Sequence, residues 1–335
     1  MTEKFQDLSI DYEFKNEERD EIISHLEEIK VNPYKHYPSF RRVVLNETIS
    51  LAPIRRFIKF LERRNSTSNF ANPFVFIRNS PIDRTLPIFS NDNPVHEKYQ
   101  KKKTYVTEGF LQIYAELTGQ HIISYMNVND GDAFHDIFPS TEMAESQSQK
   151  AFGPIYFHGD LSNHFVRPDV VNIVSLRSSI QNEIYTTFVS NKEIFEILSE
   201  ETKKILSEKI FLTPYGDLNS RKSKVLLGSA PKHSIITNGI NICLAENRTF
   251  SDEQRGQDAL AELLKAAHMK KKKLLMMPGD FVSIHNNLSL HGKEIGVVSD
   301  IEQQWLRWSM KTINVYSISP HLKYIEPGSD YLVHG

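Results

Sequence analysis

Two residues with metal-binding side chains, His158 and Asp160, stand two positions apart near the middle of the chain. On a strand, residues i and i+2 point to the same face, so this imidazole and this carboxylate can reach one metal ion. A third ligand is needed, and His291 is the candidate. Two histidines and one carboxylate leave three positions of an iron ion open, as in the facial triad of non-haem Fe(II) oxygenases.

The spacing His-x-Asp/Glu is a weak signal by itself. It occurs again at His25 and Glu27, where a solvated face of a charged helix explains it. His158 differs because it follows an apolar run at 154–157 and precedes a strand-like run at 170–176. From spacing alone, a metal ligand and a structural histidine remain equally good interpretations of His158.

Further short motifs accompany this pair along the chain. In order they are His158-Gly159-Asp160, Arg167-Pro168-Asp169, Leu176-Arg177, Pro278-Gly279-Asp280, Asn286-Asn287, His291-Gly292 and Arg307-Trp308. Together they resemble the clavaminate synthase-like branch of the TauD-type Fe(II)/2-oxoglutarate oxygenases, which includes hydroxylases of free amino acids. The resemblance runs from about residue 110 to 317, and several linked motifs in the right order are a much stronger signal than any one of them.

The resemblance implies a role for each metal ligand and for the co-substrate anchor. His158, Asp160 and His291 would hold Fe(II), with Asp160 in place of the Glu that is usual in this branch. 2-Oxoglutarate would chelate the iron, and Arg307 is the expected anchor of its far carboxylate, because a guanidinium binds carboxylates through two parallel hydrogen bonds. A competing register would put Gln304 at this position and lose the charge.

Two further residues receive roles from the same resemblance. Thr187 corresponds to a residue whose hydroxyl assists the 2-oxoglutarate carboxylate, and an ordinary strand residue is the alternative. Lys311 corresponds to an arginine that binds the carboxylate of an amino-acid substrate, and an exposed strand lysine is the alternative. Replacing arginine with Lys311 keeps the charge and loses the two-pronged geometry.

Composition bounds the class of protein. The chain has 335 residues, a formal charge of −2 and one cysteine, Cys243. The near-zero charge argues against a nucleic-acid partner, and the lone cysteine favours a reducing compartment. No signal peptide and no apolar run of the roughly 20 residues that span a membrane are visible. We therefore expect a cytoplasmic protein without a membrane partner; the sequence does not reveal its oligomeric state.

Apolar periodicity predicts a helical part before a strand-rich part. Helices are expected at 16–30, 51–64, 107–118, 191–210 and from a capping box at 251–254 to 268; strands are expected at 74–77, 122–126, 170–176, 184–189, 234–244, 281–285 and 305–317. The polar segments 65–104, 139–153 and 212–232 are interpreted as loops, the second as a possible active-site lid. The whole chain is expected to form one domain, with a mainly helical part at 1–119 and the core at 120–320.

The predicted fold is α+β, with a double-stranded β-helix (a cupin-like jelly roll) flanked by helices. The predicted function is Fe(II)- and O2-dependent hydroxylation of an unactivated C–H bond in an amino acid or derivative, free or carrier-bound, with 2-oxoglutarate converted to succinate. Two alternatives remain: a related desaturase or cyclase acting on a larger substrate, and a non-catalytic cupin-like binding module. Arg307 distinguishes an oxygenase from the binding module, because a structural metal site does not need a buried cation.

Overall fold

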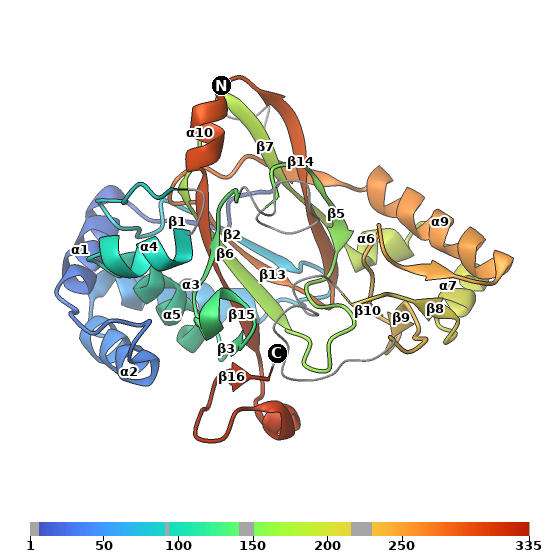
Figure 1. The fold of residues 1–335 in the computed structure, drawn as a ribbon, viewed down its shortest axis with the longest axis horizontal. Coiled ribbons are helices and arrows are strands. Elements are labelled where there is room, and N and C mark those ends of the chain that lie inside the picture. Colours follow the sequence, from blue (N-terminus) through green and yellow to red (C-terminus); the bar gives the residue numbers. More distant parts are fainter. Residues whose placement is uncertain (1–6, 91–93, 141–150, 216–229, 335) are drawn as a thin grey trace.

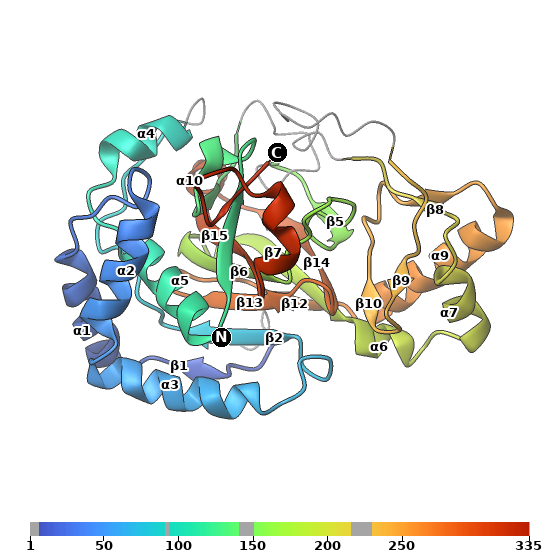
Figure 2. The same ribbon diagram turned by 90° about the horizontal axis from the view of Figure 1, so that it is seen from below.

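Two β-sheets form the centre of the molecule, and helices lie on opposite sides of them (Figures 1 and 2). The computed structural model describes residues 7–90, 94–140, 151–215 and 230–334. Over these residues the fold is a mixed α/β arrangement, as the strand-rich second half of the sequence predicts. The candidate site lies between the two sheets.

The larger sheet has eight strands in the order β1-β2-β13-β6-β15-β3-β16, with β4 also paired to β15. Its strands are β1 (Tyr12–Glu13), β2 (Phe74–Arg78), β3 (His121–Tyr125), β4 (His135–Ile137), β6 (Val170–Arg177), β13 (Phe281–His285), β15 (Trp308–Val315) and β16 (Leu332–Val333). The pairings β2–β13–β6–β15–β3 are antiparallel. The central strands β13 and β15 are buried along their whole length, because both faces of the sheet are covered.

The smaller sheet is antiparallel and has the order β12-β7-β14-β5. Its strands are β5 (Ile155–His158), β7 (Asn182–Ser190), β12 (Lys272–Leu274) and β14 (Ser289–Val298). β14 continues past His291 to Val298. A short helix, α10 (Ile301–Leu306), then leads directly into β15.

The helical N-terminal part packs against the larger sheet. It contains α1 (Asn16–Glu27), α2 (Tyr37–Thr48), α3 (Ala52–Asn65), α4 (Pro94–Lys101) and α5 (Val106–Leu117). The rings of Phe110 and Tyr114 on α5 lie 5.5 and 4.5 Å from that of Phe281 on β13, so aromatic contacts join helix and sheet. The predicted apolar faces of α1 and α3, including Ile22, Leu26 and Phe57, are buried in the same core.

A second lobe, residues 191–215 and 230–269, lies on the opposite side of the sheets (Figures 1 and 2). It contains α6 (Asn191–Phe195), α7 (Glu200–Leu206), β8 (Phe211–Leu212), β9 (Ile236–Thr237), β10 (Asn241–Ile242), β11 (Phe250–Ser251) and α9 (Gln254–Met269). It has its own apolar core, in which Leu206, Phe211 and Leu263 are fully buried. This lobe contacts β5, the strand that ends in His158.

Several sequence predictions were wrong in detail. The helices α2, α4 and α10 were not expected. Segment 65–104 was read as surface loop, but α4 lies in it and Lys98 is fully buried there. The expected cap of the last long helix also differs, because Glu253 occupies the N-cap of α9 in place of Ser251. Most of the possible lid 139–153, namely residues 141–150, and most of 212–232 lie outside the described residues.

Candidate metal centre

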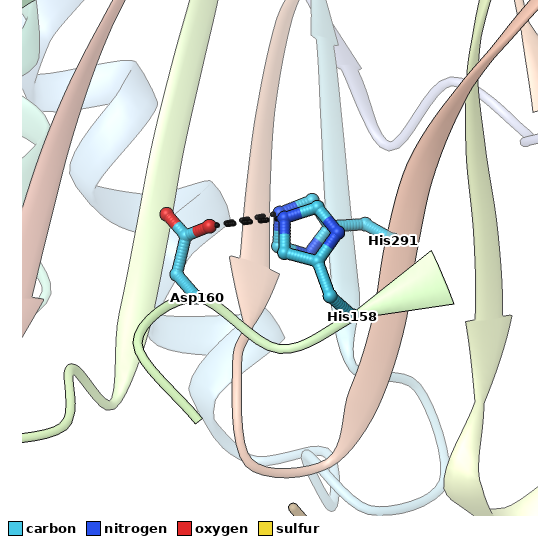
Figure 3. A group of neighbouring side chains, drawn as sticks. All are labelled: His158, Asp160 and His291. Carbon is cyan, nitrogen blue, oxygen red and sulfur yellow. Dashed lines mark ion pairs between the residues drawn. The ribbon is translucent and has the colours of Figure 1, made fainter. Parts of the chain in front are cut away.

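The register of the smaller sheet brings the two candidate histidines together. His158 is the last residue of β5, and it pairs directly with His291 on β14. Asp160 lies in the turn that follows β5 and points its carboxylate back toward both imidazoles (Figure 3). The three residues therefore form one group, although His158 and His291 are 133 positions apart by number.

Asn286 fixes the turn that carries Asp160. Its side-chain carbonyl accepts the backbone N–H of Asp160 at 2.6 Å, and its amide donates to the backbone carbonyls of Asp160 at 3.0 Å and Pro168 at 2.9 Å. Gly159 is required here, because a Cβ atom would lie 2.9 Å from Arg167 Nη2 and 3.3 Å from the Asn286 carbonyl. The motif residues Gly159, Arg167 and Asn286 thus position the carboxylate.

The spacing of the donor atoms fits one small metal ion. Asp160 Oδ1 lies 3.3 Å from His158 Nε2 and 3.5 Å from His291 Nε2. One donor atom from each residue can be chosen so that all three lie within 4.8 Å of one another, and among the described residues this is the one such group of three or more. Neighbouring ligands bound at about 2.1 Å and right angles would be about 3.0 Å apart, so small side-chain adjustments suffice.

The protonation states also suit a metal ligand set. The Nδ1 atom of His158 lies 2.9 Å from the Tyr156 carbonyl, and if it donates there its Nε2 is left free to bind a metal. Burial, followed by the neighbouring His158, lowers the pKa of His291 and favours a neutral imidazole. Burial raises the pKa of Asp160, but Lys311 and the two imidazoles outweigh it, so that the pKa lies well below 3.8.

Lys311 contacts the same carboxylate from the opposite sheet. It lies on β15, and its ammonium donates to Asp160 Oδ2 at 2.6 Å, so Oδ1 is the oxygen that faces the histidines. Only one of its three N–H donors is used in this contact. The others remain available to a ligand in the adjoining cavity, which Lys311 also lines.

This cavity separates the two sheets and adjoins the three candidate ligands. The smaller sheet contributes Ile155, Ile184, Thr186 and Lys293, and the larger sheet and its flanking segments contribute Ile137, Ile173, Ser175, Leu275, Met276, Ser309 and Arg307. The wall is thus mostly apolar with a few charged groups, as is typical of small-molecule sites. His158, Asp160 and His291 lie at its border.

Arg307 is a half-buried cation in this wall. It is the C-cap of α10, immediately before β15, rather than a strand residue as the sequence suggested. Its Nε and Nη2 atoms are buried without any hydrogen-bond partner, and burial lowers its pKa to about 10. An arginine normally uses its donors in a fixed fork, so these idle atoms indicate a place for an anionic ligand.

Gln304 and Lys293 line the cavity as well. Both side-chain polar atoms of Gln304 are buried without a partner, so the two competing registers of the motif bring their residues to the same cavity. Burial lowers the pKa of Lys293 to about 6, with Arg307 as the smaller cause. Sequence reasoning missed Lys293, although its position two residues after His291 on one strand was the available signal.

Thr187 does not reach the cavity, which corrects the sequence prediction. On β7 it pairs with Gly292, whereas Thr186 pairs with Lys293 and lines the cavity. Alternate residues of a strand face opposite sides, and a Cβ atom at Gly292 would lie 3.0 Å from the Thr187 hydroxyl. The side chain of Thr187 therefore occupies the other face of the sheet.

The remaining motif residues have structural contacts. Arg177 donates to the backbone carbonyls of Leu86, Pro87 and Leu306, and Asp169 accepts from Asn287 and from the Tyr316 backbone. Three other buried histidines are hydrogen-bonded: His135 to Ser124, His164 to the Val166 backbone, and His285 to Tyr316. None of them joins the candidate metal group.

Comparison with known proteins yields sequence relatives among curated proteins and many structural relatives. No protein-family model matches the chain. Clavaminate synthase 2 of Streptomyces clavuligerus is 23% identical over 137 residues, which is 41% of this chain and 41% of that protein. The chain thus matches less than half the length of this curated relative.

The structural matches extend over almost the whole chain. A structure of asparagine oxygenase with Fe(II), a hydroxyasparagine and succinate superposes with a TM-score of 0.80, at 17% identity, over 97% of this chain and 99% of that one. The iron oxygenase OrfP with iron, succinate and a hydroxyarginine gives 0.79, at 17% identity, over the same shares. The chain has the fold of these oxygenases, and the resemblance inferred from the motifs is confirmed. No helix within the described ranges is both long and apolar enough to cross a membrane.

Proposed function

We propose that this chain is an Fe(II)/2-oxoglutarate-dependent oxygenase that hydroxylates an amino acid or a derivative of one. A single observation carries the proposal: the His158–Asp160–His291 group borders a cavity into which a half-buried, unpartnered Arg307 also faces. A metal site alone needs no such cation. The fold shared with asparagine oxygenase and OrfP supports the same assignment, and so does the sequence match to clavaminate synthase 2.

The residues fit the iron and its co-substrate. His158, Asp160 and His291 would hold Fe(II), and the guanidinium of Arg307 would bind the distal carboxylate of 2-oxoglutarate. When bound, the iron, O2 and 2-oxoglutarate supply the oxidising chemistry: one oxygen atom enters the substrate C–H bond, the other enters succinate, and CO2 leaves. An iron with three protein ligands keeps open positions for this chemistry.

The protein's own share of the work is positioning. Asn286 and Lys311 hold the two ends of Asp160 in place, so that its Oδ1 atom faces the histidines. Apolar side chains such as Ile184 and Met276 keep the cavity wall dry, which strengthens the attraction between Arg307 and a carboxylate. We also propose that a spare N–H of Lys311 binds the carboxylate of the substrate.

The architecture that supports this site is proposed to be a single-domain double-stranded β-helix. Two sheets face each other across the cavity, and the candidate ligands come from the smaller one while Lys311 comes from the larger one. In such a fold a small-molecule substrate would enter between the sheets. The alternative of a non-catalytic binding module is disfavoured by the idle donors of Arg307.

The test is anaerobic titration of the Fe(II)-loaded protein with 2-oxoglutarate, following the weak visible charge-transfer band of the chelate. The band should appear in wild type and be absent in Asp160→Ala. In Arg307→Ala it should appear only at a much higher concentration of 2-oxoglutarate. Succinate formation with a panel of amino acids then identifies the substrate. Wild type without a band at any 2-oxoglutarate concentration would overturn the proposal in favour of the binding module.

A further inference from the structure

We infer that Lys293 is a second cationic anchor for the distal carboxylate of the co-substrate, acting beside Arg307. This inference rests on the proposed function, and it assigns a role to a residue for which the motifs provided none. It also replaces Thr187, whose hydroxyl the structure places on the far side of the sheet. The co-substrate site would then contain two cations in place of a cation and a hydroxyl.

The pairing of β14 with β7 determines the direction of Lys293. His291, Gly292 and Lys293 pair without a break with Phe188, Thr187 and Thr186. Side chains two positions apart on a regular strand share a face, so Lys293 faces the same side as His291. Both line the cavity. The intervening Gly292 faces away, where a Cβ atom would meet the Ile155 carbonyl at 2.6 Å.

Lys293 is buried without a counterion among the described residues. Its side chain belongs to a residue that is 8% exposed, and its ammonium donates to the Ala151 carbonyl at 2.6 Å. A carbonyl satisfies one of the three N–H donors but does not cancel the charge. Within the described ranges no carboxylate forms an ion pair with Lys293, and a buried charge without a counterion is costly.

Arg307 presents the same deficiency in the same cavity. Neither cation has an ion-pair partner among the described residues, and the one carboxylate that borders the cavity, Asp160, already contacts Lys311. Among the described residues, the wall therefore has two cationic side chains without a countercharge, and an anionic ligand would supply one. A carboxylate fits both: Arg307 can bind its two oxygens in parallel, and Lys293 can approach as a point charge.

The experiment compares two probes that differ only at the far end. 2-Oxoglutarate carries the distal carboxylate, and 2-oxopentanoate is a 2-oxo acid of the same chain length with a methyl group there. Their dissociation constants are measured anaerobically from the visible band of the Fe(II)-loaded protein. Wild type is compared with Lys293→Met, Lys293→Arg and Arg307→Met, and Lys270→Met, at an exposed lysine after α9, serves as control.

Lys293→Met should weaken the binding of 2-oxoglutarate about 10- to 100-fold, the range for a hydrogen bond to a charged group. It should weaken the binding of 2-oxopentanoate less than about twofold. Lys293→Arg should keep most of the preference for 2-oxoglutarate, and Lys270→Met should change nothing. Lys293→Gln repeats the comparison if the methionine variant is unstable, and melting temperatures identify that case. A merely structural lysine would not discriminate between the two probes.

Three outcomes would overturn the inference. If Lys293→Met weakens the binding of both probes equally, the lysine stabilises the fold and does not bind the distal carboxylate. If it weakens neither while Arg307→Met weakens 2-oxoglutarate, Arg307 anchors the carboxylate alone and the proposed function stands. If wild type forms no band with 2-oxoglutarate, the proposed function fails and the role of Lys293 fails with it.

Discussion

Buried cations occur in two regions of this molecule, with opposite surroundings. In the helical part, Lys98 donates to Asp132 at 2.9 Å and to Asp136 at 2.6 Å, and its whole side chain is buried. In the cavity, Lys293 is buried and Arg307 is half-buried with its Nε and Nη2 atoms fully covered, yet no described carboxylate pairs with either. The first region has its countercharges built in, and the second lacks them.

A second lysine of the helical part repeats the pattern. Lys102 donates to Asp83 at 2.7 Å and to Glu108 at 2.8 Å, although its place in the run 101–103 suggested a solvated loop. The difference between the regions teaches how to separate structural from ligand-binding cations. A cation whose partners are carboxylates of the chain holds the fold together, whereas a cation with idle donors in a cavity awaits an anion from outside.

The largest expected effect tests the structural side of this comparison. Lys98→Met leaves Asp132 and Asp136 buried without their cation, so the free energy of unfolding should fall by about 3–5 kcal/mol. Urea unfolding followed by circular dichroism measures it. Lys101→Met, three residues further along α4 in an exposed ion pair with Glu97, is the control and should cost no more than about 1 kcal/mol.

The cavity side of the comparison predicts the reverse. Arg307→Met removes a half-buried charge that has no countercharge, so the unliganded protein should be as stable as wild type or more stable. The same unfolding experiment decides this. A loss as large as that of Lys98→Met would show that Arg307 is structural, and the distinction between the two regions would collapse.

Burial favours the neutral form of two histidines, His164 and His285. Burial lowers the pKa of His164 and of His285 to about 4, against about 6.5 when exposed. Between these values the unfolded chain binds more protons, so stability is lost as the pH falls from about 6.5 to 4, by up to about 3 kcal/mol for each group. Unfolding free energies at pH 7.5 and 5 measure this, and His285→Gln should flatten the dependence; a wild type equally stable at both values would contradict it.

A smaller effect is expected where space is limiting. Gly159→Ala places a methyl group against Arg167, a third kind of buried cation that donates to the Ile242 carbonyl at 2.6 Å. Overpacking of this kind costs about 1–3 kcal/mol and should displace the Asp160 turn. Fe(II) affinity should therefore weaken together with stability. Stability lost with unchanged Fe(II) affinity would mean that the turn is independent of the arginine.

The smallest expected effect concerns the hydroxyls of β7. Thr187→Val should change the dissociation constant of 2-oxoglutarate less than about twofold, because this side chain faces away from the cavity. Thr186→Val, on the cavity side, is the matched variant and should have the larger effect. The opposite order would restore the role that the motifs gave to Thr187 and would remove the need for Lys293.

Local spacing predicted what local geometry determines. The pair His158 and Asp160 could be read from the sequence because two residues suffice to place both side chains on one side of a metal. Choosing His291 and Arg307 needed the family motifs, since no spacing rule connects residues that meet only through the sheets. The amphipathic helices α1 and α3 were predicted for the same local reason.

The failures share a non-local cause. Whether Thr187 or Thr186 faces the cavity depends on the register between β7 and β14, which a single strand does not reveal. Lys98 could not be predicted as buried, because its burial depends on Asp132 and Asp136, which lie on another segment. Lys293 was missed because a lysine after a His-Gly pair looks like a surface residue until the opposing sheet is known.

The strand that ends in His158 is held from two sides. β14 pairs with one edge of this strand. The lobe is hydrogen-bonded to the other edge: the Gly159 N–H donates to the Leu244 carbonyl at 3.0 Å, and the Glu246 N–H donates to the Phe157 carbonyl at 2.9 Å. The lobe also contacts the strand of His291, because Leu290 on β14 is buried in the core of the lobe. The lobe and the candidate metal centre therefore share their supporting strands. If a ligand of the lobe changed the affinity for Fe(II), Fe(II) would change the affinity for that ligand by the same factor.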